Sequence, residues 1–337
     1  MSNETPTSLI FPLSVPLTVA QFNVENLFVY MERYDGENLE SLTERTWQKL
    51  SARSQTRNKP LKKLWGLEAA ISEINPDILL LNEVGGRESL NNFNHFFLEN
   101  RFNGFLHRGN SLRGIEVAAL VKKELPFHIS VRSHAHKPLQ LLYEHEKVLP
   151  KAPRHLHSRD ILELRFHNSQ NDLLLIILLT HLKSKLDPDR IDPFGSLRRE
   201  AEVRLLVDVY NSLSANNIPI LVVGDFNGHA GSLETEHEFL PIYEHTDLVD
   251  CMDLTPKSPS ERMTHTQIYP SGQVRELQID YLFINRPFKN WVVADQTYVY
   301  RYKIDDVEIP IPKNLEQRMQ LPSDHYPVVL RLKKPHF

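Results

Sequence analysis

The sequence predicts an α/β fold in which buried strands alternate with amphipathic helices. Two apolar runs of strand length, 78–81 and 220–223, are bounded by turn signals, which is typical of strands buried on both faces. Elsewhere, apolar residues recur at three- and four-residue spacing, as in 64–74, and this spacing indicates helices with one apolar face. The 22 prolines outnumber the 12 glycines, which favours extended segments over a mainly helical fold.

The elements can be placed along the chain from the same patterns. Residues 159–164 and 172–179 are expected to form an antiparallel pair, and the helix over 64–74 should stop at Asn75-Pro76. The remaining expected helices are 90–97 and 197–209, and the remaining expected strands are 17–22, 78–81, 115–121, 220–223, 277–284 and 328–330.

Composition is that of an ordinary globular domain. With 337 residues, no internal repeat and no segment of linker composition, we expect a single domain over 1–337, with a polar tail at 1–16 and insertions at 31–60 and 134–157. The formal net charge of −4 means that a polyanion would have to bind a local basic patch.

The chain carries no sign of export. Cys251 is the only cysteine, so neither an intrachain disulfide nor a thiolate metal cluster is possible, and a reducing compartment fits. The apolar residues 9–19 lack a preceding basic region and are interrupted by Pro12 and Pro16, so they match neither a signal peptide nor a membrane span. We therefore expect a cytoplasmic protein.

The two insertions have open interpretations. Residues 31–60 could track a phosphate backbone, with Trp47 as a stacking platform, or could be a solvated face that also contains Glu37, Glu40 and Glu44. The basic residues concerned are Arg45, Lys49, Arg53, Arg57 and Lys59. The five histidines of 134–157 lack the spacing of a zinc site, so this insertion is predicted to be a surface loop.

Polar residues interrupt or end several of the apolar runs. They are carboxylates, amides and imidazoles: Asn23, Glu83, His181, Asp225, Asn227, Asp280, Asp324 and His325. Each alone could be a plain strand-to-loop turn. Magnesium takes one or two protein carboxylates, so Glu83 with Asn23, and with Asp324 as a further candidate, would suffice to hold it, whereas zinc would want more imidazole or thiolate. Glu116, inside an apolar strand, either needs a buried partner or faces solvent.

Six segments in order resemble the endonuclease/exonuclease/phosphatase superfamily, which includes pancreatic-type deoxyribonuclease, abasic-site endonucleases, sphingomyelinases and inositol-polyphosphate 5-phosphatases. They are Phe22-Asn23-Val24-Glu25-Asn26-Leu27, Pro76 to Val84, Thr180-His181-Leu182-Lys183-Ser184, Gly224-Asp225-Phe226-Asn227, Ile279-Asp280-Tyr281 and Ser323-Asp324-His325-Tyr326-Pro327. The resemblance implies a four-layer α/β sandwich, with two mixed sheets face to face, helices outside, and an active site at one edge of the sheets.

The resemblance also implies roles for the residues in these segments. Glu83 would be the main ligand of Mg²⁺, for which Mn²⁺ could substitute, with Asn23 beside it and Asp324 nearby. Asp225 would orient and deprotonate the attacking water, and Asn227 would hold the phosphate or that water.

The histidines and their partners complete the implied set. His325 would bind or protonate a phosphate oxygen or share the general-base role, and Asp280 would fix its tautomer. His181 is similar to a histidine that the deoxyribonuclease and sphingomyelinase branches share; in the deoxyribonuclease pattern a glutamate steadies it and it faces the leaving oxygen. Glu116 is the matching glutamate. Arg159 matches a phosphate-contacting arginine of the deoxyribonuclease-like branch, the alternative being a surface arginine paired with Asp160.

The resemblance thus implies a magnesium-dependent phosphodiesterase, and we expect a nuclease that cleaves DNA or RNA. A phospholipid or inositol-phosphate phosphoesterase is the alternative, with Leu139–Tyr143 as the short apolar segment that could face a lipid. A non-catalytic docking protein on the same fold would be expected to have lost Glu83, Asp225 or His325, and all of these are present.

Overall fold

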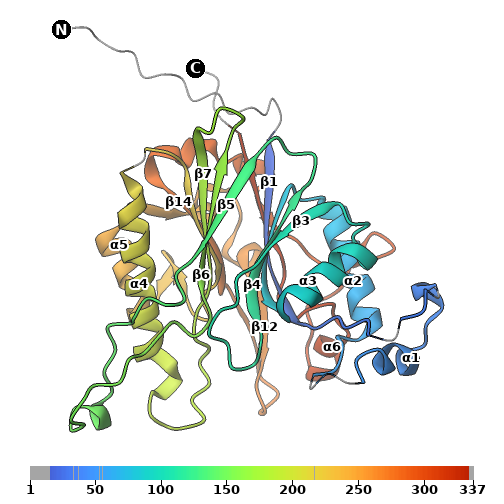
Figure 1. The fold of residues 1–337 in the computed structure, drawn as a ribbon, viewed down its shortest axis with the longest axis horizontal. Coiled ribbons are helices and arrows are strands. Elements are labelled where there is room, and N and C mark those ends of the chain that lie inside the picture. The colour runs from blue at the N-terminus through green and yellow to red at the C-terminus, as the bar shows by residue number, and fades with distance from the viewer. Residues whose placement is uncertain are drawn as a thin grey trace, which may run out of the picture.

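The computed structural model describes residues 16–333 except 33, 37, 53, 55 and 216, and it forms an α/β sandwich (Figure 1). Two six-stranded mixed sheets pack face to face, and helices cover the outer face of each, as the sequence resemblance implies. The tail predicted for 1–16 lies outside the described residues up to residue 15, and so do Glu37 and Arg53 of the first insertion.

The first sheet has the strand order β15-β18-β1-β2-β4-β3. Its central strands β1 and β2 run parallel, and the other pairs of neighbours are antiparallel. Helices α2 (Leu61–Ile74) and α3 (Gly86–Phe97) pack on its outer face. The strand bounds are β1 Leu17–Leu27, β2 Ile78–Val84, β3 Phe102–Phe105, β4 Glu116–Lys122, β15 Tyr298–Val299 and β18 Val328–Leu332.

The second sheet has the order β11-β14-β8-β7-β6-β5, and β7 and β8 are its parallel pair. Helices α4 (Ser196–Ser214) and α5 (Leu240–His245) cover it on the side away from α2 and α3 (Figure 1). The predicted antiparallel pairing of 159–164 with 172–179 is confirmed by β6 and β7. The strand bounds are β5 His128–Ser133, β6 Ile161–His167, β7 Leu173–His181, β8 Ile220–Asp225, β11 Leu248–Asp250 and β14 Asp280–Asn285.

Shorter elements lie around the sandwich. They are α1 Glu44–Lys49, α6 Leu315–Gln320, β9 Ala230–Gly231, β10 Glu234–Thr235, β12 His265–Ile268, β13 Val274–Leu277, β16 Lys303–Ile304 and β17 Val307–Glu308. In the part of the chain that the structure describes, no helix is long and apolar enough to cross a membrane.

The central strands are apolar on both faces because each is packed between the partner sheet and a helix layer. In β7, Leu175 and Ile177 join the core between the sheets, whereas Ile176 and Leu178 pack with α4 and α5. This alternation explains the continuous apolar runs from which the strands were predicted.

Two strand boundaries differ from the prediction. The strand expected over 277–284 is divided, because β13 ends at Leu277 and β14 begins at Asp280. Between them, the backbone N–H of Ile279 donates to Thr264 Oγ1. β1 also continues past Phe22 to Leu27, with a register shift between Asn23 and Leu27.

The prediction that Trp47 could stack on a base is wrong. Its side chain is fully buried, the indole Nε1 donates to the carbonyl of Lys59 at 2.8 Å, and the ring contacts Phe97 edge to face. Lys59 is also buried, and its ammonium pairs with Glu25 at 3.3 Å. These two residues therefore hold the first insertion on the core, and neither is available to a phosphate backbone.

The second insertion, 134–157, is mostly loop, with one short 3-10 helix at Glu144–Glu146. It is not a surface loop throughout, because Leu139, Glu146 and His157 are buried. Pro138 forms an isolated bridge with Leu156, so the two ends of the insertion are tied together.

Candidate active site

The two parallel strand pairs bring four of the polar residues to one edge of the sandwich. Asn23 and Glu83 lie near the carboxyl ends of β1 and β2, and His181 and Asp225 end β7 and β8. Side chains at the carboxyl ends of parallel strands emerge on the same side of a sheet, and here the two sheets face each other. The Asn23 Nδ2–H donates to Asp225 Oδ2 at 2.9 Å, which links the two sheets directly.

Gly224 fixes where Asp225 stands. Its φ of 146° and its closeness to β7 exclude any residue with a side chain at position 224, because a Cβ there would lie 1.9 Å from the carbonyl oxygen of Thr180. After this point the backbone N–H of Asn227 donates to Asp225 Oδ1 at 2.8 Å, and the Asn227 amide donates to the carbonyl of Leu182 at 3.1 Å. The turn therefore orients Oδ1 of Asp225, and Asn23 of β1 orients Oδ2.

His325 and Asp280 form a buried pair beside Asp225. The His325 Nδ1–H donates to Asp280 Oδ2 at 2.7 Å, which leaves Nε2 directed toward Asp225, 3.9 Å from its Oδ2. Asp280 is opposite Asp225 in the antiparallel pairing of β14 with β8. This register brings together residues that are 55 positions apart in the sequence, as the difference of their numbers shows.

The electrostatics of this group favour a charged imidazole at His325. Burial alone would lower the pKa of His325, but the carboxylates of Asp280, Asp225 and Asp324 raise it well above its usual value. Burial and the neighbouring Asp280 raise the pKa of Asp225 to about 7. Asp225 can therefore gain and lose a proton near neutral pH while His325 stays charged.

His181 is held in the neutral form. Its Nε2 lies 3.5 Å from Asp225 Oδ2. Burial, followed by the positive charges of Arg159 and His325, holds the pKa of His181 well below its usual value. A neutral imidazole can still donate one hydrogen bond, so His181 can contact a leaving oxygen without carrying an extra proton.

The oxygen atoms of Glu83 and Asn23 suit a hard metal cation as ligands. Glu83 has a positive φ of 68°, and its Oε2 accepts the N–H of Asn26 at 2.9 Å. Its Oε1 accepts no hydrogen bond from any residue that the structure describes, so this oxygen is open to a ligand. Asn23 adds an amide oxygen, and oxygen donors of this kind match Mg²⁺. The nearby group of Asp225, Asp280 and His325 fits a metal poorly, because the imidazolium already supplies positive charge.

The expected contact between Glu116 and His181 is not formed. Glu116 is buried, but its Oε2 accepts the N–H of Gly109 at 2.9 Å. The Nδ1 of His181 has no hydrogen-bond partner among the described residues. The alternative of a solvent-facing Glu116 is also wrong, since β4 is covered on both faces.

Arg159 is not a surface residue paired with Asp160. Its guanidinium is buried and its Nη1 donates to the carbonyl of Leu182 at 3.1 Å, whereas Asp160 accepts the N–H of His134 at 2.9 Å. The carbonyl of Leu182 is the group that Asn227 also contacts, so Arg159 adjoins the candidate site.

Sequence reasoning missed residues that support the site. The ring of His265, on β12, is tilted against the His325 ring with the ring centroids 4.7 Å apart. The His265 Nδ1–H donates to the carbonyl of Asp324 at 3.0 Å, and burial lowers the pKa of His265 to about 4. Gln21 donates to Asp280 Oδ1 at 2.8 Å and to Asn82 at 2.9 Å. Gln21 could have been found from the sequence, because it is a polar residue inside the apolar run of β1.

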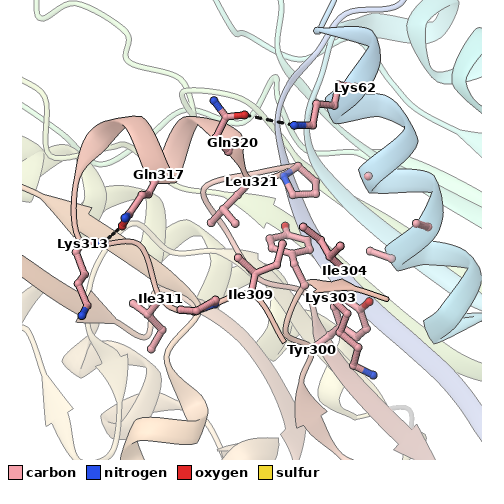
Figure 2. A pocket seen from close by; sticks show the side chains of 16 residues that line it. Lys62, Tyr300, Lys303, Ile304, Ile309, Ile311, Lys313, Gln317, Gln320 and Leu321 are labelled. Carbon is pink, nitrogen blue, oxygen red and sulfur yellow. Dashed lines mark hydrogen bonds between the residues drawn. The ribbon is translucent and has the colours of Figure 1, made fainter. Parts of the chain in front are cut away.

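Two cavities adjoin this region. One of about 560 Å³ is bordered by Arg159 and Lys183. The other, of about 590 Å³, lies between α2, the hairpin β16–β17 and α6, and Figure 2 shows Ile304, Ile309 and Leu321 around it. Pro322 lines the second cavity just before Ser323-Asp324-His325 in sequence.

Solved structures show the same fold at low identity. The human Nocturnin catalytic domain with bound sulfate anion is 16% identical, with a TM-score of 0.56 over 94% of each chain. D. rerio TDP2 complexed with a single-strand DNA product is 14% identical, with a TM-score of 0.55 over 95% of this chain and 99% of that one. An endonuclease/exonuclease/phosphatase from Bacteroides vulgatus is 11% identical, with a TM-score of 0.55 over 95% of this chain and 100% of that one.

Comparison with family models gives a match along most of the sequence. No curated protein sequence matches this chain significantly. The model described as "Endonuclease/Exonuclease/phosphatase family" matches residues 20–325, a range that runs from β1 to His325 and includes every candidate site residue. The chain therefore belongs to the endonuclease/exonuclease/phosphatase family.

Proposed function

We propose that this chain is a magnesium-dependent phosphodiesterase that hydrolyses DNA or RNA, with Mn²⁺ as a possible substitute for Mg²⁺. The observation that carries the proposal is the position of Asp225. Its Oδ2 is contacted by Asn23 from the metal-binding side at 2.9 Å and lies 3.9 Å from His325 Nε2. A carboxylate between a cation site and an imidazolium can activate a water for attack at phosphorus.

Each residue has a defined part in a single in-line displacement. Asp225 takes a proton from the attacking water, whose oxygen forms the new bond to phosphorus, and Asn227 orients that water or a phosphate oxygen. His325 donates a hydrogen bond from Nε2 to a non-bridging phosphate oxygen, because Asp280 holds its Nδ1–H.

His181 acts on the leaving oxygen, which lies on the side of phosphorus opposite to the attacking water. It donates a hydrogen bond to the leaving oxygen as the bond from phosphorus to that oxygen breaks, and the leaving oxygen then takes up a proton from solvent water. Magnesium, when bound by Glu83, Asn23 and Asp324, supplies positive charge that stabilises the phosphoryl oxygens in the transition state.

Three observations support the preference for nucleic acid over lipid. D. rerio TDP2, which shares this fold, was crystallised with a single-strand DNA product. The segment Leu139–Tyr143, the candidate for lipid contact, has Leu139 buried and Leu142 as its exposed leucine, so it offers little apolar surface to a membrane. The exposed Arg45, Lys49 and Arg57 remain available to a phosphate backbone.

The test is magnesium-dependent hydrolysis by the purified protein, with an EDTA control. The substrates are plasmid DNA, single-stranded DNA, RNA, sphingomyelin and inositol phosphates. We expect cleavage of nucleic acid that stops with EDTA and in Asp225→Asn, and that continues in Asp295→Asn, a change of an exposed aspartate. Turnover of only a lipid or an inositol phosphate would overturn the substrate, and no turnover of any substrate would favour a docking protein.

A further inference from the structure

The cavity of about 560 Å³ beside the candidate site is lined by four cationic side chains. Arg113 comes from the loop before β4, Arg159 from the segment before β6, Lys183 from the segment after β7, and Arg198 from the first turn of α4. Tyr143, from the second insertion, lines the same cavity. The insertion therefore helps to build this space.

Three of these cations are held by neutral groups. Arg113 donates to Asn26 Oδ1 at 2.5 Å, Arg159 to the carbonyl of Leu182, and Lys183 to the carbonyl of Ser184 at 2.9 Å. Within the part of the chain that the structure describes, none of the three forms a direct ion pair, whereas Arg198 lies 3.5 Å from Glu202. The charges of Glu202, Glu83 and Asp225 act on Arg159 from a greater distance, and the charge of Glu202 acts on Lys183. The positive charge of these three cations is therefore offset only through space, because no carboxylate among the described residues accepts a hydrogen bond from their side chains.

The carboxylates of the cavity wall do not pair with these cations. Asp192 accepts the backbone N–H groups of Leu197 and Arg198 at the start of α4, and Asp187 accepts those of Ile191 and Asp192. The third carboxylate, Asp189, is exposed to solvent. Burial lowers the pKa of Lys183, and the charges of Arg159 and Arg198 lower it further, whereas Glu202 opposes this effect. An anion entering the cavity would relieve the repulsion between these cations.

The cavity joins the candidate site on the His181 side. Arg159 and Asn227 donate to the same carbonyl, that of Leu182. Arg113 contacts Asn26, whose N–H donates to Glu83. A leaving group that departs from a phosphorus near His181 would therefore extend toward these cations.

We propose that this cavity is a subsite for a second phosphate, carried by a leaving group of about the size of a nucleotide. The inference rests on the proposed phosphodiesterase function and names its substrate class. The volume of about 560 Å³ lies in the range of small-molecule sites. Apolar side chains of Leu156, Leu186 and Ile191 in the wall can contact a sugar or base while the cations hold the phosphate.

The test compares a dinucleotide with the same dinucleotide carrying an extra phosphate at either its 5′ or its 3′ end. In the wild-type protein with Mg²⁺, we expect one phosphorylated form to have a kcat/KM about tenfold or more above the parent. Lys183→Met and Arg113→Met should each remove most of this preference, whereas Lys257→Met, a surface lysine paired with Glu261, should keep it.

A long single-stranded oligonucleotide without terminal phosphates identifies the source of the second phosphate. If it is cleaved as fast as the preferred dinucleotide, the flanking phosphate of a polymer fills the subsite. If it is cleaved more slowly, a terminal or small-molecule phosphate does.

Equilibrium binding of adenosine 3′,5′-bisphosphate, measured by calorimetry, gives a readout without turnover. We expect binding to wild type that weakens about tenfold in Lys183→Met. Equal rates on all three dinucleotides with unchanged binding in Lys183→Met would overturn the subsite while leaving the phosphodiesterase intact. The proposed function fails separately, if no nucleic acid is cleaved at all.

Discussion

His325 Nδ1 lies 2.7 Å from Asp280 Oδ2, and both side chains are buried. A carboxylate in this position holds the imidazole in one tautomer and stabilises its protonated form. The free Nε2 faces Asp225, so the pair sets both the direction and the charge of the group that would meet the substrate.

Replacing Asp280 with asparagine should lower turnover much more than it lowers substrate affinity. Asp280→Asn keeps the shape but can present its NH₂ group to His325, so we expect kcat to fall about 10²- to 10⁴-fold with KM changed only a few-fold. Steady-state kinetics with Mg²⁺ measures this. Asp253→Asn, which alters a carboxylate paired with Arg262, is the matched control. A loss confined to KM would contradict a role in orienting His325.

Loss of His181 should depend on the leaving group. With His181→Ala, we expect a drop of about 10²-fold or more for a nucleic-acid substrate, because its alkoxide leaving group needs a hydrogen bond. An aryl ester such as bis(4-nitrophenyl) phosphate should lose much less, since its leaving group is stable as an anion. His245→Ala, an exposed histidine, serves as the control. Equal losses on both substrates would argue against contact with the leaving oxygen.

Glu83→Gln should weaken magnesium binding, because the change removes the charge of the proposed main ligand and keeps its size. We expect the Mg²⁺ dissociation constant, measured by calorimetry, to rise about tenfold or more. Glu88→Gln, on the nearby helix α3, should bind Mg²⁺ as wild type does. The assignment would be wrong if both variants bound the ion equally well.

Gly224→Ala should destabilise the fold. The added Cβ would lie 1.9 Å from the carbonyl oxygen of Thr180, and the backbone φ of 146° is unfavourable for alanine. We expect the free energy of unfolding to fall by at least about 3 kcal/mol. Gly272→Ala also has a positive φ but meets nothing within 4 Å, so it should cost only about 1 kcal/mol. Urea denaturation of both variants distinguishes steric overlap from backbone strain.

Asp250 should make stability depend on pH. Burial, followed by the charge of Asp253, raises the pKa of Asp250 to about 7 in the folded protein, above its unfolded value of about 3.9. The folded state therefore holds the Asp250 proton more tightly than the unfolded state does. The stability that this proton contributes is fully present below pH 4 and is lost as pH rises through 7.

Asp250→Asn cannot ionise, so it should gain stability relative to wild type between pH 5 and pH 8. The gain should be on the order of 2–4 kcal/mol in the free energy of unfolding. Denaturation curves of both proteins at the two pH values measure it, with the exposed Asp189→Asn as control. Parallel changes in all three proteins would show that Asp250 is ionised throughout.

Much of the architecture could be predicted from local pattern. The alternation of apolar runs with helical periodicity located the central strands β2, β7 and β8 and the helices α2 and α4 within a few residues. The turn at Gly224 was also visible in the sequence, because glycine followed by short polar residues marks a strand exit.

Local pattern failed where a residue's environment depended on distant segments. Trp47 lies in a polar stretch, yet it is buried because α3 and Lys59 close over it. Glu116 was expected to contact His181, but the loop before β4 supplies the N–H of Gly109 instead. His265 gave no periodic signal, since it reaches the site through the pairing of β12 with the segment around His325.

The sequence by itself determined where the central strands and helices lie, which strands carry polar ends, and which chemistry those ends could perform. These properties follow from side-chain type and from the period of two or 3.6 residues, which are local. The tertiary structure alone decided that Asp280 stands opposite Asp225, that Asn23 bridges the two sheets to it, and that four cations surround one cavity. Strand register and the packing of one sheet on another join segments far apart in the chain, and no local period encodes them.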